Sequence, residues 1–157
     1  MEKLINGREI SYEYIRGLID GEGCFSFSTI GYKDINGNKK KLPAFLLSMS
    51  KRDEELIKKV KEKLKIRNKI HVYKVKKRID RYNRQPMAIL IIRDLGQLKN
   101  TIVPLCYKKL IGNKAKQFDE WIEKIGTDPN VSEQYKIIYN LQKWGFYDKE
   151  EMAKKFN

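Results

Sequence analysis

Ten consecutive residues, Tyr14 to Gly23, constrain the fold of this chain more than any other segment. They read Tyr-Ile-Arg-Gly-Leu-Ile-Asp-Gly-Glu-Gly, an apolar helical stretch that ends in small residues and carries two carboxylates near its C-terminal end. Gly17 and Gly21 lie four residues apart and therefore share one face of the predicted helix. Because neither has a Cβ atom, a second helix can approach this face closely.

Asp20 and Glu22 are the two carboxylates at the end of this helix. Acidic side chains are unfavourable there by roughly 0.3–1 kcal/mol, because they meet the negative end of the helix dipole. A glycine near a helix end is often only a C-cap, and neighbouring acids are then merely solvated. The functional interpretation is that the Glu22 carboxylate meets its copy from a second chain and holds a metal ion. The residues alone leave both interpretations open.

The segment Ile15-Arg-Gly-Leu-Ile-Asp-Gly-Glu-Gly23 resembles the signature motif of the LAGLIDADG homing endonucleases. The positions that match the motif are Gly17, Leu18, Ile19, Asp20 and Gly23. Ile15 replaces leucine, Glu22 replaces aspartate, and Arg16 and Gly21 replace the two alanines. Gly21 keeps the small packing residue, whereas Arg16 is expected to point away from any tight interface.

Two further stretches extend the resemblance from about Tyr12 to Ile125, with the spacing between landmarks kept. Cys24-Phe-Ser-Phe-Ser28 resembles the family's first strand. A later part of the chain resembles the segment that carries the family's basic catalytic residue. It comprises Val103-Pro-Leu, Leu110-Ile-Gly-Asn-Lys-Ala-Lys-Gln-Phe118 and Trp121.

The resemblance implies an intron-encoded homing enzyme that cuts DNA with Mg²⁺, or with another divalent cation such as Mn²⁺ or Ca²⁺. It makes Glu22 the direct metal ligand together with the backbone carbonyl of Gly21. Lys114 corresponds to the family's active-site lysine, which positions water or offsets charge on the scissile phosphate, and Lys116 is a nearby rival. Asp20 ranks second among the acids, as a residue expected to make hydrogen bonds near the interface.

One expected residue is missing from the sequence. The family often places a glutamine after the second strand to orient water, and the segment Met49-Ser-Lys-Arg-Asp53 contains none. Ser50, Lys51 and Arg52 are the candidates to replace it.

A single copy of the motif implies a homodimer, because cutting both strands of a duplex requires two active sites. Two-fold symmetry makes the contact isologous. The residues expected at this interface are Tyr14, Gly17, Leu18 and Gly21. Two Glu22 carboxylates ~4 Å apart repel by about 4 kcal/mol at an effective dielectric of 20, so either a proton or divalent cations must hold them together. Hard oxygen ligands favour Mg²⁺ over zinc.

The charge of the chain points to a polyanionic partner. Its 157 residues include 34 Lys and Arg against 20 Asp and Glu, a formal net charge of +14, and solubility alone does not require such an excess. The sequence contains no apolar run of about 18 residues, so we expect an intracellular protein without a membrane partner. Cys24, Cys106 and His71 are too few for a disulfide framework or for a cysteine- or histidine-based metal site within one subunit.

Hydrophobic periodicity predicts an α+β fold of order α-β-β-α-β-β-α, with a four-stranded antiparallel sheet backed by helices. Four helices are expected. The first runs from the N-cap Ser11 to Gly23, and the second starts at Asp53. The third runs from the N-cap Asp94 to Ile102, and the fourth spans Asn113 to Ile125 and is stopped by Gly126. The first expected strand starts at Phe25, and Asn36-Gly37 is expected to form the hairpin turn that follows it. The other three expected strands are Ala44 to Ser50, Lys69 to Val75 and Met87 to Arg93.

The core domain is expected to span residues 1–126, and residues 127–157 are expected to form a C-terminal helical extension of it. Two helical segments around Gly145 fit either a helix-turn-helix or a helical cap over the core.

Sequence recognition is expected to fall to the sheet, because a two-stranded ribbon fits the major groove and alternate side chains then face the bases. Candidates on the first hairpin are Ser26, Ser28, Ile30, Tyr32, Lys33 and Asn38. The further DNA-binding candidates are Lys51, Arg52, Lys69, Lys74, Lys76, Arg78, Arg81 and Lys116. Residues 65–84 hold nine Lys or Arg against the single acid Asp80, and most of these cations are expected to contact phosphate.

The leading hypothesis is therefore a homodimeric endonuclease that makes a double-strand break at a near-palindromic site of about 20 bp, one helical turn per subunit. One alternative keeps the fold without cleavage, as a splicing maturase that binds intron RNA or as a DNA-binding protein. Another is a small basic ribosome-associated or architectural protein, in which the Gly-Glu-Gly helix end is accidental.

Overall fold

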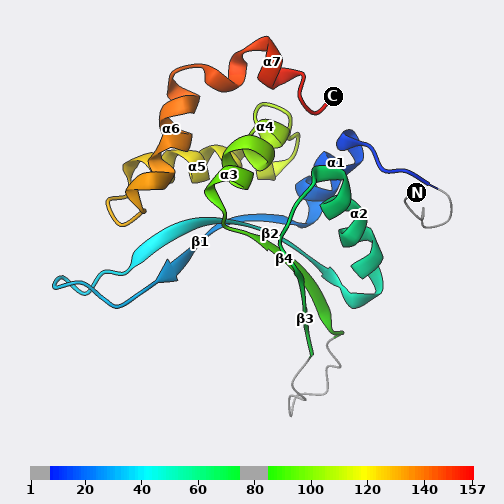
Figure 1. Ribbon diagram of the computed structural model, residues 1–157, viewed down its shortest axis with the longest axis horizontal. Coiled ribbons are helices and arrows are strands. Elements are labelled where there is room, and N and C mark those ends of the chain that lie inside the picture. Colours follow the sequence, from blue (N-terminus) through cyan, green and yellow to red (C-terminus); the bar gives the residue numbers. More distant parts are fainter. Residues whose placement is uncertain (1–7, 75–84) are drawn as a thin grey trace.

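The computed structural model describes residues 8–74 and 85–157 of the chain (Figure 1). The elements of the first half are α1 (Tyr12–Glu22), β1 (Gly23–Ile30), β2 (Lys40–Ser50), η2 (Lys51–Asp53), α2 (Glu54–Leu64), β3 (Ile70–Tyr73) and β4 (Met87–Ile92). Those of the second half are α3 (Leu95–Gln97), η3 (Leu98–Ile102), α4 (Val103–Cys106), α5 (Asn113–Thr127), η4 (Glu133–Tyr135), α6 (Lys136–Lys143), η5 (Phe146–Asp148) and α7 (Glu150–Ala153). The predicted α+β class is confirmed.

The sheet has four antiparallel strands in the order β1-β2-β4-β3, so β1 and β3 are its two edges. One row of paired residues crosses all four strands, from Gly23 through Leu47 and Leu90 to Ile70. The helices lie on one face of the sheet, and no helix of the described residues covers the other face (Figure 1). The open face is therefore free for a partner.

The core lies between the sheet and the helices. Phe45 and Leu90 from the sheet, Ile19 from α1 and Phe118 from α5 are almost completely buried. Each such side chain contributes roughly 1.5–3 kcal/mol when it leaves water. Among the residues that the structure describes, no helix is long and apolar enough to cross a membrane.

Helix α1 begins and ends as the sequence predicts. The Ser11 hydroxyl accepts a hydrogen bond from the Tyr14 N–H at 3.0 Å and so caps the first turn. At the other end the Gly23 N–H donates to the Ile19 carbonyl, and the chain enters β1 at once. A Cβ atom on Gly23 would lie 2.8 Å from the Ile19 Cγ2 atom. Only glycine fits this junction without a shift of α1.

The first hairpin is longer than the sequence predicts. Strand β2 starts at Lys40 rather than at Ala44, and residues 31–39 connect it to β1. The hairpin turn forms one residue earlier than predicted, with Ile35 and Asn36 at its centre, because the Gly37 N–H donates to the Asp34 carbonyl at 2.9 Å. The Asp34 carboxylate also accepts the N–H groups of Asn36 and Asn38.

The prediction that a helix ends at Ile102 is wrong, because the helical backbone continues through α3, η3 and α4 to Cys106. Pro104 lies inside this helix, where it cannot donate a backbone hydrogen bond. A π turn in η3 absorbs the irregularity. The carbonyls of Lys99 and Asn100, one turn before the proline, accept from side chains of the C-terminal segment instead. Their donors are the Tyr147 hydroxyl at 2.9 Å and the Lys155 ammonium at 2.8 Å.

The prediction that Gly126 stops the last core helix is also wrong, because α5 continues to Thr127. Gly126 is a packing site: a Cβ atom there would lie 2.1 Å from the ring of Tyr139 in α6. Ile138 and Tyr147 of the C-terminal segment are buried in the same core as the sheet. This segment therefore caps the helical layer, whereas the division of the chain at residue 126 remains a prediction.

We predict that Gly126→Ala destabilises the protein by about 1–3 kcal/mol, because an over-packed contact must push Tyr139 and α6 away from α5. Urea denaturation measures the change. The control is Glu120→Ala, at an exposed position of the same helix, which is expected to change the free energy of unfolding by less than about 0.5 kcal/mol. Equal stability of the two variants would show that Tyr139 does not pack on Gly126.

Candidate functional site

Helix α1 leaves one face uncovered in the single chain. A Cβ atom built on Gly17 or on Gly21 meets no heavy atom within 4 Å. Tyr14, on the same face, is 50% exposed, and Leu18 is half-buried. Three of the four residues predicted to form a dimer interface, Tyr14, Gly17 and Gly21, thus share a face that no described part of the chain fills, whereas Leu18 at its border also packs against the core.

Arg16 points into the protein, away from the glycine face, as predicted. Its Nε donates to the Leu105 carbonyl at 2.8 Å, and a terminal guanidinium nitrogen donates to the Phe156 carbonyl. Burial lowers the pKa of the Arg16 guanidinium from its ordinary value, although arginine stays charged in proteins. This side chain therefore ties α1 to α4 and to the C-terminal end of the chain.

Asp20 joins α1 to the start of α5. Its carboxylate oxygens accept the backbone N–H groups of Ile111 and Gly112, each at 3.1 Å. The first turn of α5 contains no acidic residue of its own, although it holds Lys114 and Lys116 at the positive end of the helix dipole. Asp20 supplies the missing negative charge from outside the helix. It thereby fixes the helix start that carries the predicted active-site lysine.

Glu22 is the last residue of α1, and its side chain is exposed. Its carboxylate makes no hydrogen bond or ion pair with any described residue, in contrast to Asp20. The two acids therefore have different surroundings, as expected from their separation around the helix. The last carbonyls of a helix lack intrahelical donors, so this helix end offers backbone oxygens beside the Glu22 carboxylate.

These oxygens are the hard donors that Mg²⁺ and Ca²⁺ prefer, so the residues present fit a divalent cation. They are too few to hold one alone. Within residues 8–74 and 85–157, no three His, Cys, Asp or Glu side chains come together as a metal site. A second copy of the chain, water or phosphate must therefore complete the ligand set.

The sheet register identifies a polar neighbour of Glu22 that the sequence analysis missed. Because Gly23 pairs with Leu47, the next residue of β2, Ser48, lies beside the end of α1. Ser50, Lys51 and Arg52, the candidates to replace the missing glutamine, lie further along β2 and η2. Counting the register back from a turn centred on Asn36-Gly37 would have placed Lys51, not Ser48, opposite Glu22, because the connection between β1 and β2 is centred earlier in the chain.

The open face of the sheet carries the predicted base-contact residues. Phe25 and Phe45 face the core, so the alternate residues of β1, among them Ser26, Ser28 and Ile30, face the other way. Tyr32, Lys33, Asn38, Lys51, Arg52, Lys69, Lys74 and Lys116 are all exposed. Lys76, Arg78 and Arg81 lie outside the described residues.

Sequence reasoning also missed the surroundings of two exposed side chains, His71 and Ile111. His71 of β3 pairs with Ile89, which pairs with Ser48, so both polar residues share a row on the open face. Ile111 is 93% exposed beside the Asp20 carboxylate. An isoleucine in a short apolar run gives no sequence signal of exposure, because such residues are usually buried.

A comparison with protein families shows to which family this chain belongs. The profile described as LAGLIDADG endonuclease matches residues 15–125, which is more than half of the chain. The chain belongs to the LAGLIDADG endonuclease family. The match contains both the motif helix and the start of α5. No curated protein matches the chain significantly.

Solved structures of LAGLIDADG homing endonucleases share the fold. The homing endonuclease I-TnaI is 21% identical, with a TM-score of 0.57, over 96% of this chain and 90% of its own. I-LtrWI, bound to its target DNA, is 21% identical with a TM-score of 0.56, over 99% of this chain and 44% of its own. I-SmaMI, bound to uncleaved DNA in the presence of calcium ions, is 16% identical with a TM-score of 0.58, over 92% of this chain and 48% of its own. The chain thus spans nearly all of the first and about half of the other two.

We predict that Asp20→Ala lowers the free energy of unfolding by about 1–3 kcal/mol, because two backbone N–H groups lose a charged acceptor. Chemical denaturation measures the loss. Asp119→Ala is the matched control, since Asp119 is exposed on α5 and makes no hydrogen bond with a described residue. If both variants were equally stable, Asp20 would not hold the start of α5.

Proposed function

We propose that this LAGLIDADG protein is a site-specific homing endonuclease that cuts both strands of a long, near-palindromic DNA site as a homodimer. The observation that carries the proposal is the Glu22 carboxylate, exposed at the end of a helix whose glycine face is open. The Asp20 contact holds the start of α5, with Lys114, next to the same helix. A carboxylate that can hold a divalent cation and a lysine that can offset phosphate charge suit metal-assisted phosphodiester hydrolysis, and the exposed cations suit binding of a polyanionic substrate.

The homodimer follows from one motif per chain and from the open face of α1. I-LtrWI and I-SmaMI are about twice as long as the part this chain covers, which suits two copies of the present chain in place of one longer chain. Two copies packed through Gly17 and Gly21 would bring their Glu22 carboxylates together. Ile111, exposed beside Asp20, would lie at the border of this contact and lose its water.

In the proposed site the Glu22 carboxylate and the Gly21 carbonyl hold Mg²⁺ or another divalent cation. When bound, the cation lowers the pKa of its water and stabilises charge on the scissile phosphate. The Lys114 ammonium offsets negative charge on the phosphate, and Asp20 acts on it as a positioning residue through α5. Ser48, beside the end of α1, is a candidate to orient the attacking water.

Double-stranded DNA is the proposed substrate. The net charge of +14 favours a polyanion, and the open sheet face presents alternating side chains that can read base edges in the major groove. Ser26, Ser28 and Tyr32 are the proposed base contacts on the first hairpin, whereas the exposed lysines and arginines contact phosphate.

We predict that the wild-type protein linearises a plasmid carrying its target only when Mg²⁺ or Mn²⁺ is present. Glu22→Gln keeps the size of the side chain but removes its charge. It is expected to reduce cleavage by at least about 10³-fold, since a neutral amide is a poor ligand for a hard cation. Gel-shift binding of the target is expected to change much less. Full cleavage by Glu22→Gln, or cleavage in excess chelator, would exclude the proposed site.

Helix packing can be tested separately from cleavage. Gly17→Leu is expected to keep the monomer folded, because its side chain enters open space and leucine favours a helix over glycine by about 0.8 kcal/mol. The same side chain should prevent close helix contact and weaken dimerisation at least about 100-fold in analytical ultracentrifugation, a cost of the size that over-packing produces. Glu151→Leu, at an exposed position of α7, is the control and should dimerise normally. A fully dimeric Gly17→Leu variant would contradict the proposed interface.

A further inference from the structure

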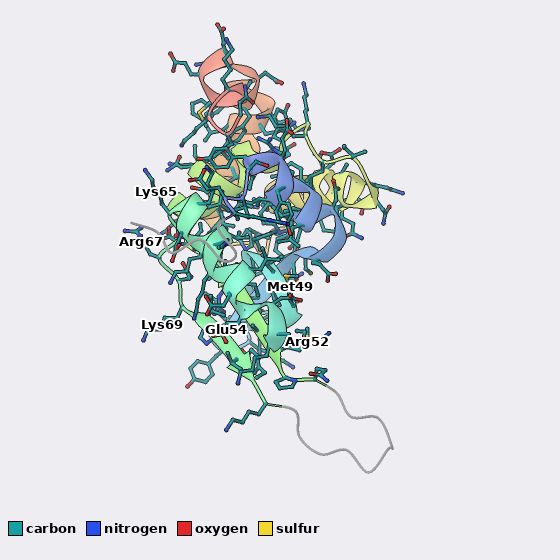
Figure 2. All side chains as sticks on the ribbon, turned by 90° about the vertical axis from the view of Figure 1, so that its right-hand side faces the viewer. Met49, Arg52, Glu54, Lys65, Arg67 and Lys69 are labelled. Carbon is teal, nitrogen blue, oxygen red and sulfur yellow. The ribbon has the colours of Figure 1, made fainter. Side chains whose placement is uncertain are left out.

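The connection between α2 and β3 carries three cations on one side of the chain. Lys65, Arg67 and Lys69 are exposed, whereas Ile66 between them is buried and Asn68 is half-buried. Figure 2 shows the three following one another down the same side of the molecule. We call residues 65–69 the basic turn.

Lys65 occupies a backbone position where glycine is the usual residue. It has a φ of 57°, in the left-handed region, directly after α2. Its N–H donates to the Glu62 carbonyl at 3.1 Å, and the Ile66 N–H donates to the Lys61 carbonyl at 2.9 Å. These two bonds form a Schellman cap, in which glycine avoids the steric cost of a Cβ atom. The sequence keeps a charged side chain here although a smaller residue would suit the backbone better.

The buried side-chain amide of Gln97 holds the rest of the basic turn in place. Gln97 is 8% exposed; its Oε1 accepts the Arg67 N–H at 2.9 Å, and its Nε2 donates to the Asn68 Oδ1 at 2.6 Å. The Asn68 amide donates in turn to the Ile91 carbonyl of β4 at 3.0 Å. None of the three exposed cations makes an ion pair with a described residue. The basic turn thus holds three unneutralised charges on a rigid backbone.

The register places this turn across the sheet from Glu22. Gly23 at the β1 edge and Ile70 at the β3 edge are the two ends of one row of paired residues. Glu22 and Lys69 precede these residues, and because β1 and β3 run in opposite directions, they lie on opposite sides of that row. Three strand spacings separate the ends, which is roughly 14 Å. The major groove of B-DNA is about 12 Å wide. A sheet of this width that faces the groove brings its two edges to the two phosphate backbones that border it.

We propose that the basic turn binds the phosphate backbone of the DNA strand that lies across the major groove from the strand held at Glu22. This inference rests on the proposed function. The contact sets the orientation of the duplex on the sheet and reads no sequence, because lysine and arginine contacts to phosphate carry none. Lys65 and Arg67 therefore join Lys69 as DNA-contacting residues, in a role distinct from base recognition on the open face.

The test is a triple variant, Lys65→Gly, Arg67→Gln and Lys69→Gln, in the full-length protein. Lys65→Gly suits the left-handed backbone, so the melting temperature should not fall. Each cation that is removed from a phosphate should weaken binding roughly fivefold at about 0.15 M salt and reduce the slope of log affinity against log salt by about 0.9. Affinity for target and for unrelated duplexes should fall by the same factor, so that their ratio stays constant.

The control removes three charges from the C-terminal helical segment, with Lys143→Gln, Lys149→Gln and Lys154→Gln, and lowers the net charge equally. It should change the salt slope much less than the first variant. Methylphosphonate substitution locates the contact: neutral linkages in the strand across the groove from the cut should abolish the affinity difference between wild type and the basic-turn variant.

Equal effects of the two triple variants would overturn the inference, and so would a changed affinity ratio, which would mean that the turn reads bases. A loss of affinity confined to an RNA hairpin would also overturn it. If the wild type binds and cuts its target in these experiments, the failure concerns the basic turn alone. If the wild type binds no duplex DNA, both the proposed function and the inference about the basic turn fail.

Discussion

The direct passage of α1 into β1 at Gly23 is the constraint on which the site depends. No linker separates the helix from the edge strand, because Gly23 is both the C-cap of α1 and the first residue of β1. Glu22 is therefore fixed at the corner between the helical layer and the open face of the sheet. A side chain on Gly23 would collide with Ile19 and release this corner, so fold and site share one requirement.

A second constraint is electrostatic. Helix α5 starts with lysines at the positive end of its dipole, an arrangement that costs roughly 0.3–1 kcal/mol for each exposed charge. The Asp20 carboxylate offsets this cost from α1 and at the same time sets the spacing between the two helices. Arg16 anchors the opposite side of α1 to the Leu105 and Phe156 carbonyls. Asp20 and Arg16 of the motif helix are thus committed to the fold, whereas Glu22 at its end suits a ligand supplied from outside.

The sequence predicts the motif helix, its Ser11 cap, the sheet and the fold class, because these follow from local periodicity and capping. It does not predict that α5 continues past Gly126, since the reason is the ring of Tyr139 packed on that glycine from a later helix. The predicted helix end at Ile102, shortly before Pro104, is wrong for the same reason. Carbonyls near the proline accept hydrogen bonds from Tyr147 and Lys155, and only the folded chain brings these side chains near. Ser48 and Ile111 escape notice because strand register and loop exposure depend on long-range pairing.

The central claim is that two copies of this chain bring two Glu22 carboxylates to divalent cations at the cut phosphates. A crystal structure of the protein with its selected target duplex and Mn²⁺, measured at the manganese absorption edge, tests it most directly. The account predicts two chains related by a two-fold axis, Gly17 faces in contact, and anomalous peaks within about 2.5 Å of Glu22 oxygens. A single chain on the duplex, or manganese bound away from Glu22, would contradict it.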